Sequence, residues 1–268
     1  MPTVEANGIR IGYEIRGQGH PLLLIAGVGY SRWFWNRLIP LLEDRYQIIA
    51  MDNRGAGESD KPLGPYTVPM MAADAAGLLD ALGIQGAYVM GHSLGGFIAQ
   101  ELAISRPDLV AKLVLASTNH GGMKVIPITQ EALEVMTRRE GDPLELIRRG
   151  IEVACAPGFA ARHPDLVQDL IAYRLGNPVP PDAYQAQVMA GMGMAALTDE
   201  EVDRRMAALT MPVLILTGDQ DKVVPPGNAD LMARKIPHAQ VKVIPNTGHL
   251  FPFEDPLTTA AILKEFLG

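Results

Sequence analysis

The stretch from residue 87 to residue 96 constrains the fold of this chain more than any other. An apolar run, residues 87–90, is typical of a short buried strand. It leads into Gly91-His92-Ser93-Leu94-Gly95, which matches Gly-x-Ser-x-Gly, and residues 97–103 then carry apolar side chains at helical spacing. Strand, tight turn and helix form the context in which this pattern makes a nucleophile elbow. We therefore predict that Ser93 sits on a strained turn with its hydroxyl clear of a sheet.

The residues around Ser93 fit that prediction physically. Gly91 and Gly95 flank the serine, where side chains would collide with the neighbouring strand and helix. The N-terminus of the following helix points backbone N–H groups and its positive dipole at an anion formed near Ser93. The alternative interpretation is a glycine-rich turn with an incidental serine. A base and an acid elsewhere in the chain would favour the nucleophile elbow over this alternative.

Candidates for a base and an acid follow two later predicted strands. A serine hydroxyl is a weak nucleophile, so it needs an adjacent base, and the base needs an acid that orients it. Asp219 and Asp221 come directly after the apolar run 213–217, and His249 comes after the last predicted strand, residues 239–244. The resulting chain order, serine then aspartate then histidine, differs between serine hydrolase folds and so is informative about the fold.

The first part of the chain alternates strands with helices. Continuous apolar runs at 21–26, 47–51 and 111–116 are typical of strands buried on both faces of a parallel sheet. Residues 8–17 alternate apolar and polar positions, which predicts a half-exposed antiparallel strand at the edge. Helices are expected over 33–42 and 68–82. The predicted fold class is α/β, a mostly parallel sheet flanked by helices.

This rhythm changes near Gly121. Residues 128–209 contain no convincing strand, and prolines and glycines separate five helical segments, at 129–140, 143–154, 164–175, 181–192 and 198–208. We interpret residues 122–209 as a helical cap inserted into a core made of 1–121 and 210–268. Both ends of the insertion emerge near the carboxyl edge of the sheet, where ligands bind in open α/β folds, so we expect the cap to cover Ser93.

Composition excludes several classes of protein. The chain has 268 residues, 48% of them hydrophobic and 20% charged, which suits one large globular domain with an insertion. The net charge of −7 is spread along the chain, so we expect neither nucleic acid nor a membrane surface as a partner. The single cysteine, Cys155, cannot form an intrachain disulfide or a cysteine metal cluster. Without a signal peptide pattern or a membrane-length apolar run, a cytoplasmic protein is expected.

The sequence resembles the α/β-hydrolase fold family over essentially its full length. The matching motifs are residues 91–96, the loop 52–59, Gly218-Asp219-Gln220-Asp221 with Val224-Pro225, and Gly248-His249 followed by Glu254-Asp255-Pro256. The resemblance implies the α/β-hydrolase fold with Ser93 as nucleophile, Asp221 as acid and His249 as base. It makes Asp219, the runner-up acid, a solvated turn residue or a cap for its loop. It implies no metal and no cofactor.

The same resemblance places an oxyanion hole at the backbone N–H groups of Leu94 and Val28. Many relatives carry His-Gly just before the second donor, whereas this chain has Ala26-Gly27. The change removes a side chain that usually braces the loop, but it keeps the backbone donor.

The substrate pocket is expected to involve side chains from several segments. His120 follows a strand end at the site entrance, and the methionines of the cap are first a buried helix face and second an adaptable apolar wall. We interpret Asp52 and Arg54 as an ion pair that braces their loop, and His92 as a packing residue beside the site. The predicted pocket residues are Gly27, Trp33, His120, Phe159, Met189, Met192 and Leu250.

The serine at the elbow sets this chain apart from relatives with aspartate there, such as epoxide hydrolases and dehalogenases. We predict a serine hydrolase that cleaves carboxylic esters or lactones of small to medium apolar substrates, with no partner beyond that small molecule. One alternative is a carbon–carbon bond hydrolase or an enol-lactone hydrolase of aromatic degradation. Leu250 disfavours the former, since such enzymes often carry tryptophan after the catalytic histidine. A ligand receptor on a hydrolase scaffold is a further alternative, against which the complete triad argues. The oligomeric state stays open.

Overall fold

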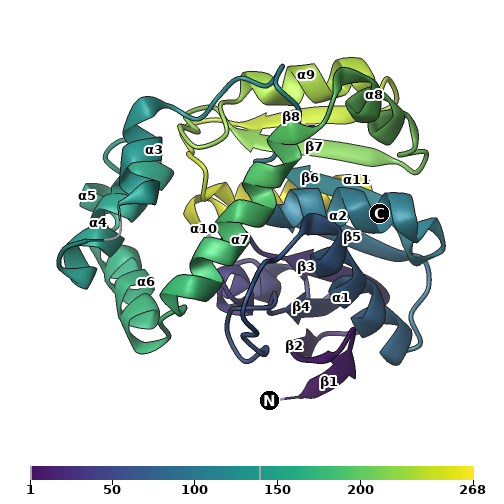
Figure 1. Ribbon diagram of the computed structural model, residues 1–268, viewed down its shortest axis with the longest axis horizontal. Coiled ribbons are helices and arrows are strands. Elements are labelled where there is room, and N and C mark those ends of the chain that lie inside the picture. Colours follow the sequence, from purple (N-terminus) through teal and green to yellow (C-terminus); the bar gives the residue numbers. More distant parts are fainter. Residues whose placement is uncertain (1, 139) are drawn as a thin grey trace.

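A single twisted sheet organises the computed structural model, which describes residues 2–138 and 140–268. Its strands lie in the order β1-β2-β4-β3-β5-β6-β7-β8 (Figure 1). β2 pairs antiparallel with both β1 and β4, and the other neighbouring strands are parallel. The fold is therefore the predicted mostly parallel α/β sheet. The strands are β1 (Thr3–Ala6), β2 (Ile9–Arg16), β3 (His20–Ile25), β4 (Tyr46–Met51), β5 (Ala87–His92), β6 (Val110–Ala116), β7 (Val213–Gly218) and β8 (Gln240–Ile244).

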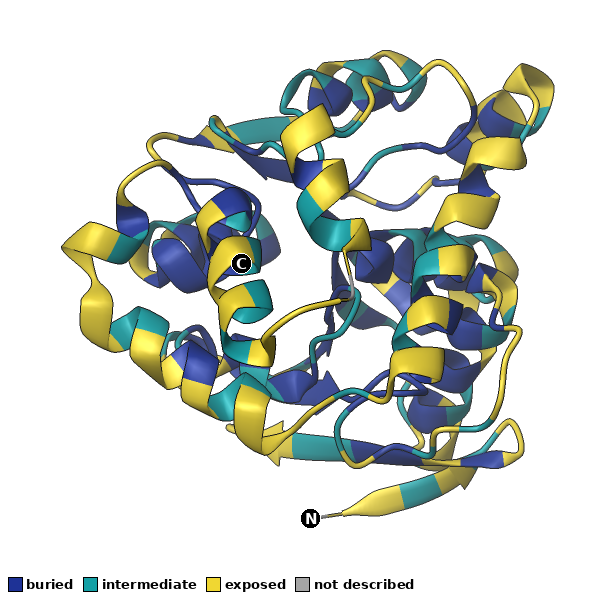
Figure 2. Cartoon of the chain, turned by 60° about the vertical axis from the view of Figure 1, so that its left-hand side comes forward, coloured by how far each residue is buried: buried dark blue, intermediate teal, exposed yellow. Residues whose placement is uncertain are grey.

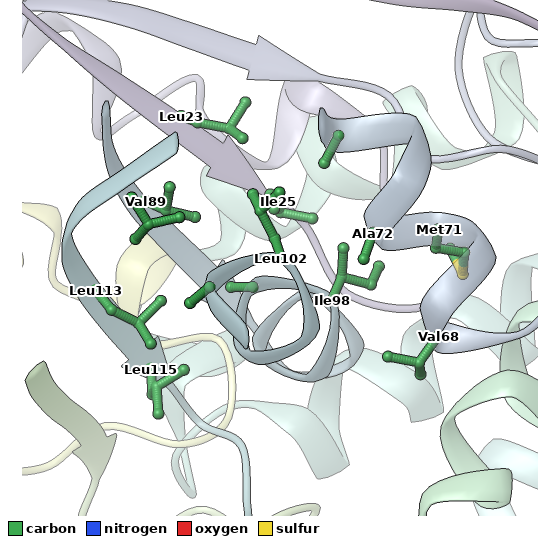
Figure 3. Close-up of a cluster of buried hydrophobic side chains, with 14 of the residues drawn as sticks. Leu23, Ile25, Val68, Met71, Ala72, Val89, Ile98, Leu102, Leu113 and Leu115 are labelled. Atoms are coloured by element: carbon green, nitrogen blue, oxygen red, sulfur yellow. The ribbon is translucent and has the colours of Figure 1, made fainter. Parts of the chain in front are cut away.

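The central strands are buried on both faces, as their apolar runs predict. In β3, Leu23 and Ile25 join the hydrophobic cluster under helices α1 (Val68–Ala81) and α2 (Leu94–Ser105), whereas Leu22 and Leu24 join the cluster on the opposite face. This alternation follows from the two-residue period of a strand. Figure 3 shows side chains of β3, β5 and β6 meeting those of α1 and α2, among them Leu23, Val89 and Leu102. The sheet is thus a rigid support for loops at its carboxyl edge.

Two predictions about the first fifty residues need correction. The antiparallel strand predicted at 8–17 is β2, but β1 pairs outside it, so β2 is not an edge strand. The short polar segment of β1 has no apolar run to signal it. The helix predicted over 33–42 is two 3₁₀ turns, η1 (Arg32–Trp35) and η2 (Ile39–Leu41). Pro40, inside η2, lacks the backbone N–H that a continuous α-helix would need at this position.

Helices cover both faces of the sheet. α1 and α2 lie on one face together with α9, which has no clear sequence signal, and α11 lies on the other. A short 3₁₀ turn, η3 (Pro107–Leu109), leads from α2 into β6. The core helices are α1 (Val68–Ala81), α2 (Leu94–Ser105), α9 (Gly227–Lys235), α10 (Phe251–Glu254) and α11 (Pro256–Leu267).

The segment between β6 and β7 is helical, as predicted, and Figure 2 shows exposed residues along the outward sides of several of its helices. The prediction over 129–140 includes residue 139, which lies outside the described residues. The other four predicted segments agree with helices to within a residue or two. The helices are α3 (Gln130–Thr137), α4 (Pro143–Ala154), α5 (Phe159–Arg162), α6 (Pro164–Gly176), α7 (Pro181–Gly193), η4 (Met194–Ala196) and α8 (Asp199–Ala207).

Helix α7 is the part of the insertion that runs across the core (Figure 1). Its small buried residues Ala183 and Ala186 approach the loop after β4, where a Cβ built on Gly55 or Gly64 would lie 3.1 Å from one of them. Small side chains on this face let the helix axis come close to the core. Within the part of the chain that the structure describes, no helix is long and apolar enough to cross a membrane.

Candidate active site

Ser93 occupies the tight turn between β5 and α2, with φ 56° and ψ −119°. A non-glycine residue with positive φ is strained by about 1–3 kcal/mol, and such strain persists only where surrounding structure imposes it. Here the Ser93 N–H donates to the Ala116 carbonyl at 2.9 Å, which ties the turn to β6. The turn has the form that the Gly-x-Ser-x-Gly pattern predicts.

The two flanking glycines are required by close backbone contacts. A Cβ on Gly91 would lie 2.0 Å from the Gly95 carbonyl oxygen, and one on Gly95 would lie 2.1 Å from the Ile25 carbonyl oxygen. Both obstacles are backbone atoms and cannot rotate away. Gly91 therefore meets the following helix and Gly95 meets the neighbouring strand β3, as predicted from the sequence.

His249 and Asp221 form a buried pair. The His249 Nδ1–H donates to Asp221 Oδ2 at 2.8 Å. Asp221 Oδ1 accepts from the N–H groups of Val223 and Val224, each at 2.8 Å, so three donors hold the carboxylate. Because Nδ1 carries the proton in this arrangement, Nε2 of His249 keeps a free lone pair. Ser93 and His249 line the same cavity.

Asp219, the alternative acid, lies elsewhere. Its side chain is exposed, and Oδ1 accepts from the Thr247 N–H at 3.3 Å. It thus caps the loop before His249 and makes no contact with the imidazole. The structure brings Asp221 to His249 and leaves Asp219 at the surface.

The loop that carries His249 is held by the insertion and by a buried glutamate. The His249 N–H donates to the Ala154 carbonyl at 2.6 Å, at the end of α4. Glu254 accepts from the N–H groups of Gly248 and Ala156, at 2.9 and 2.8 Å. Burial of the Glu254 carboxyl raises its pKa to about 7, despite these two donors. The position of the candidate base therefore depends on residues from both the core and the insertion.

His92 borders the cavity that Ser93 and His249 line, and it supports the loop of His249. Its Nε2–H donates to the His249 carbonyl at 2.7 Å, and its ring centroid is 4.8 Å from that of His249. Burial lowers the pKa of His92 well below its usual value, and the neighbouring His249 lowers it further. His92 is therefore a neutral packing residue, in line with its interpretation from the sequence.

The oxyanion loop, which we define as residues 26–30, follows β3 and lies directly against Ser93. A Cβ on Gly27 would lie 3.0 Å from the Ser93 Cβ. Val28 and Leu94 both border the space next to Ser93. Leu94 is the first residue of α2, so its N–H has no intrahelical partner and points out of the helix N-terminus. Both predicted oxyanion donors are thus close to Ser93.

The loop 52–59 is braced by two ion pairs, not by the single pair between Asp52 and Arg54 that the sequence suggests. Asp52 pairs with Arg32, whose backbone N–H also donates to the Asp52 carboxylate at 2.7 Å. Arg54 pairs instead with Asp74, on α1, at 2.5 and 2.6 Å. Burial raises the pKa of Asp52, and its hydrogen bonds oppose that rise. Asp52 and Arg54 thus each pair with a residue distant in the sequence.

Two cavities meet at Ser93 and Val28. The smaller, of about 120 Å³, also contacts His249, Leu250 and Gly27, together with Arg174 from α6. The Arg174 guanidinium stacks over the Tyr30 ring, 5.0 Å from its centroid. The larger cavity, of about 360 Å³, is lined by apolar side chains such as Phe97 and Met194 and by no charged side chain of the described residues.

The predicted pocket residues divide into two groups. Gly27 and Leu250 line the smaller cavity, and the exposed Met192 borders the larger one. Among the described residues that line the two cavities, the other four predicted side chains are absent. They are Trp33, His120, Phe159 and Met189.

Each of these four has a different place. Trp33 stacks on Tyr173, with 4.2 Å between ring centroids, and buried Phe159 packs near Phe253. Met189 and Met192 are 52% and 60% exposed, so neither is part of the buried helix face that the sequence predicts. His120 is buried, and its Nδ1–H donates to the Gly121 carbonyl at 2.6 Å, beside a separate surface depression.

Sequence reasoning missed the α7 residues that do face the site. Tyr184 lines the smaller cavity, Val188 and Gly191 line the larger one, and Gln187 bonds to the oxyanion loop. Their spacing of three and four residues marks one helix face. Within residues 2–138 and 140–268, no group of three or more His, Cys, Asp or Glu side chains is arranged to hold a metal ion.

Comparison with known proteins identifies the family. Residues 20–256 match the model of the alpha/beta hydrolase fold. A poly(3-hydroxyalkanoate) depolymerase of Ectopseudomonas oleovorans is 33% identical over 271 residues, covering 99% of this chain and 91% of that protein. An esterase from Thermogutta terrifontis, solved with malate bound, superposes with a TM-score of 0.83 at 32% identity, covering 100% and 98% of the two chains. Est816, an N-acyl homoserine lactone degrading enzyme, gives a TM-score of 0.80 at 26% identity over 99% and 100%. The chain therefore belongs to the α/β-hydrolase fold family.

Proposed function

We propose that this protein is a serine hydrolase that cleaves carboxylic esters or lactones through an acyl-enzyme on Ser93. The observation that carries the proposal is the buried Asp221–His249 pair, which shares a cavity with a serine on a strained turn. An esterase and a lactone-degrading enzyme among the structural relatives support this reaction class.

In the first half of the reaction, Nε2 of His249 takes the proton from Ser93 Oγ as that oxygen attacks the substrate carbonyl carbon. Asp221 holds the Nδ1–H and stabilises the imidazolium that forms. The carbonyl oxygen becomes an oxyanion, which accepts from the N–H groups of Val28 and Leu94. Such a donor contributes about 3–4 kcal/mol to transition-state stabilisation. The tetrahedral intermediate then collapses, and the leaving alcohol oxygen takes the proton from His249.

In the second half, a water molecule attacks the acyl carbon of the ester on Ser93. His249 takes a proton from the water, and the same two N–H groups hold the second oxyanion. Collapse releases the carboxylic acid and returns the proton to Ser93 Oγ. The chain's own residues therefore supply every proton transfer, and the step needs only water as co-substrate.

The two cavities support substrates of small to medium size. Their volumes, about 120 and 360 Å³, match one short group and one longer apolar group on either side of the scissile carbonyl. We assign the longer apolar group to the larger cavity, because Phe97 and Met194 offer it apolar contacts. Residues of α3, α4 and α7 complete the walls, in keeping with a cap role for the insertion.

The test is hydrolysis of p-nitrophenyl esters with graded acyl chains, together with a panel of lactones followed by pH titration. We expect turnover of short and medium chains, and loss of that turnover by at least about 10⁴-fold in Ser93→Ala, with an unchanged melting temperature. A folded wild-type protein that turns over no member of either panel would contradict the proposal and favour a ligand receptor. Near-parental activity in Ser93→Ala would contradict Ser93 as the nucleophile.

A further inference from the structure

The oxyanion loop is anchored on two sides by amide side chains. On the core side, Asn53 Nδ2 donates to the Ala26 carbonyl at 2.8 Å. On the side of the insertion, the Gly29 N–H donates to Oε1 of Gln187 at 2.8 Å. Gly29 directly follows Val28, the proposed oxyanion donor. The loop therefore has a fixed point on each side of that donor, although it has no histidine at position 26.

Gln187 uses both ends of its amide. Its Nε2 donates to the Arg54 carbonyl at 2.8 Å, while Oε1 accepts from Gly29. The residue is 0% exposed, so neither group has water as a substitute partner. One side chain of α7 thus joins the oxyanion loop to the loop 52–59. The guanidinium of Arg54 is itself fixed by Asp74, which makes this second loop a firm support.

The conformation of Gly29 explains why such an anchor is needed. Gly29 has φ +72°, and a Cβ there would lie 2.8 Å from the ring of Tyr184, one turn before Gln187 on α7. Glycine is thus required, but glycine also leaves the backbone free to rotate. The hydrogen bond from the Gly29 N–H to Gln187 fixes the Val28–Gly29 peptide plane. The Val28 N–H belongs to the preceding plane, Gly27–Val28, which lies between this fixed plane and the Ala26 carbonyl held by Asn53, so the two anchors together restrict its direction.

We propose that Gln187 is a positioning residue of the oxyanion hole, through which helix α7 of the insertion sets the direction of the Val28 N–H. The proposal rests on the proposed function, because it assigns that N–H to the oxyanion. It makes the insertion part of the catalytic machinery as well as a wall of the pocket. The predicted signature is a loss of transition-state stabilisation with little change in substrate binding.

The primary test compares Gln187→Met with Gln100→Met. Gln100 is also 0% exposed and donates from Nε2 to the Asn119 carbonyl, but it lies in α2 and does not contact the oxyanion loop. We expect Gln187→Met to lower kcat for a short p-nitrophenyl ester about 30- to 100-fold, with KM within about threefold. Its affinity for an alkyl boronic acid, which forms a tetrahedral adduct with serine, should fall by the same factor. Gln100→Met should keep the kcat and the boronate affinity of the wild type.

A merely structural role for Gln187 predicts a different pattern. The melting temperature would fall, but kcat per folded molecule and boronate affinity would stay within about threefold of the wild type. That result overturns the proposal, and so does a fall in kcat without a matching loss of boronate affinity. If the wild type itself hydrolyses no ester or lactone, the proposed function fails first, and this outcome is distinct from an active wild type with an equally active Gln187→Met.

Gln187→Glu keeps the proposal testable if the methionine variant does not fold. A protonated carboxyl offers one donor and one acceptor, as the glutamine amide does, whereas a carboxylate would face the Arg54 carbonyl with no donor. We expect the ratio of kcat in Gln187→Glu to kcat in the wild type to rise at least about tenfold as the pH falls from 8 to 5. A ratio near one over the whole range, which a side chain without a positioning role would give, overturns the proposal. A ratio that is flat and far below one overturns it.

Discussion

Replacing Asp221 by asparagine should disable the base while leaving the fold intact. Asp221 Oδ1 accepts from two backbone N–H groups, at 2.8 Å each, so an asparagine keeps its carbonyl oxygen at that position. Its Nδ2 then faces His249 Nδ1, where the carboxylate now accepts at 2.8 Å. Two donors cannot bond to each other, so His249 must move its proton to Nε2. The imidazole can then no longer take the proton from Ser93.

The size of this effect follows from the tautomer. The corresponding change in a Ser-His-Asp triad lowers kcat about 10⁴-fold, which is about 5 kcal/mol of activation free energy. Asp219→Asn is the matched control, because that exposed side chain offers one 3.3 Å acceptor to Thr247, which asparagine also supplies. We expect less than about a threefold change there.

The assay is kcat and KM for a short p-nitrophenyl ester at a fixed pH, with circular dichroism to confirm equal folding. An Asp221→Asn variant within tenfold of the wild type would refute the tautomer argument. A larger loss in Asp219→Asn than in Asp221→Asn would move the acid to Asp219.

Three other predictions concern packing, pH and charge. Gly95→Ala should lower the free energy of unfolding by at least about 3 kcal/mol, since its Cβ meets the Ile25 carbonyl at 2.1 Å. Gly150→Ala in α4, with open space around it, should raise that free energy by about 0.5–1 kcal/mol, and urea denaturation measures both. Because the folded pKa of Glu254 is raised from 4.5 to about 7, its contribution to stability is present below 4.5 and is lost towards pH 7. The stability of the wild type relative to Glu254→Gln should therefore fall by about 3 kcal/mol over that range, and a constant difference would contradict the raised pKa. Arg174 lines the smaller cavity, where its guanidinium can pair with a carboxylate of the substrate. Arg174→Gln should therefore lower kcat/KM for a p-nitrophenyl hemiester of a dicarboxylic acid about tenfold and leave kcat/KM for an uncharged p-nitrophenyl ester unchanged. Equal losses of kcat/KM for both esters would contradict this.

The fold and the candidate catalytic residues followed from local patterns. The elbow is predictable because its glycines are imposed by backbone contacts, such as that of Gly95 with β3, which any side chain would break. The ends of β7 and β8, which parallel pairing brings to one edge of the sheet, place an aspartate near His249, and the family resemblance chose Asp221 over Asp219. These features depend on strand ends and turn geometry, which the apolar runs and the glycines of the sequence indicate.

The lining of the pocket was much less predictable. Helix α7 carries apolar side chains around much of its circumference, so its pattern does not show which face turns to the core. The prediction of a buried face is therefore wrong for Met189 and Met192, which are both exposed. Gln187 was missed because its partner Gly29 lies 158 residues away, and a lone glutamine in a helix carries no signal of such a contact. The phase of a helix and the partners of a buried amide are decided by tertiary packing.

Covalent labelling of Ser93 tests the central claim most directly. The wild-type protein and Ser93→Ala are treated with diethyl p-nitrophenyl phosphate, and intact mass and peptide mapping follow the reaction. We expect a single diethylphosphoryl group on the peptide that contains Ser93, loss of esterase activity in proportion to labelling, and an unlabelled Ser93→Ala variant. A folded wild-type protein that remains unlabelled, or that carries the group on another residue while ester hydrolysis is blocked, would contradict Ser93 as the nucleophile.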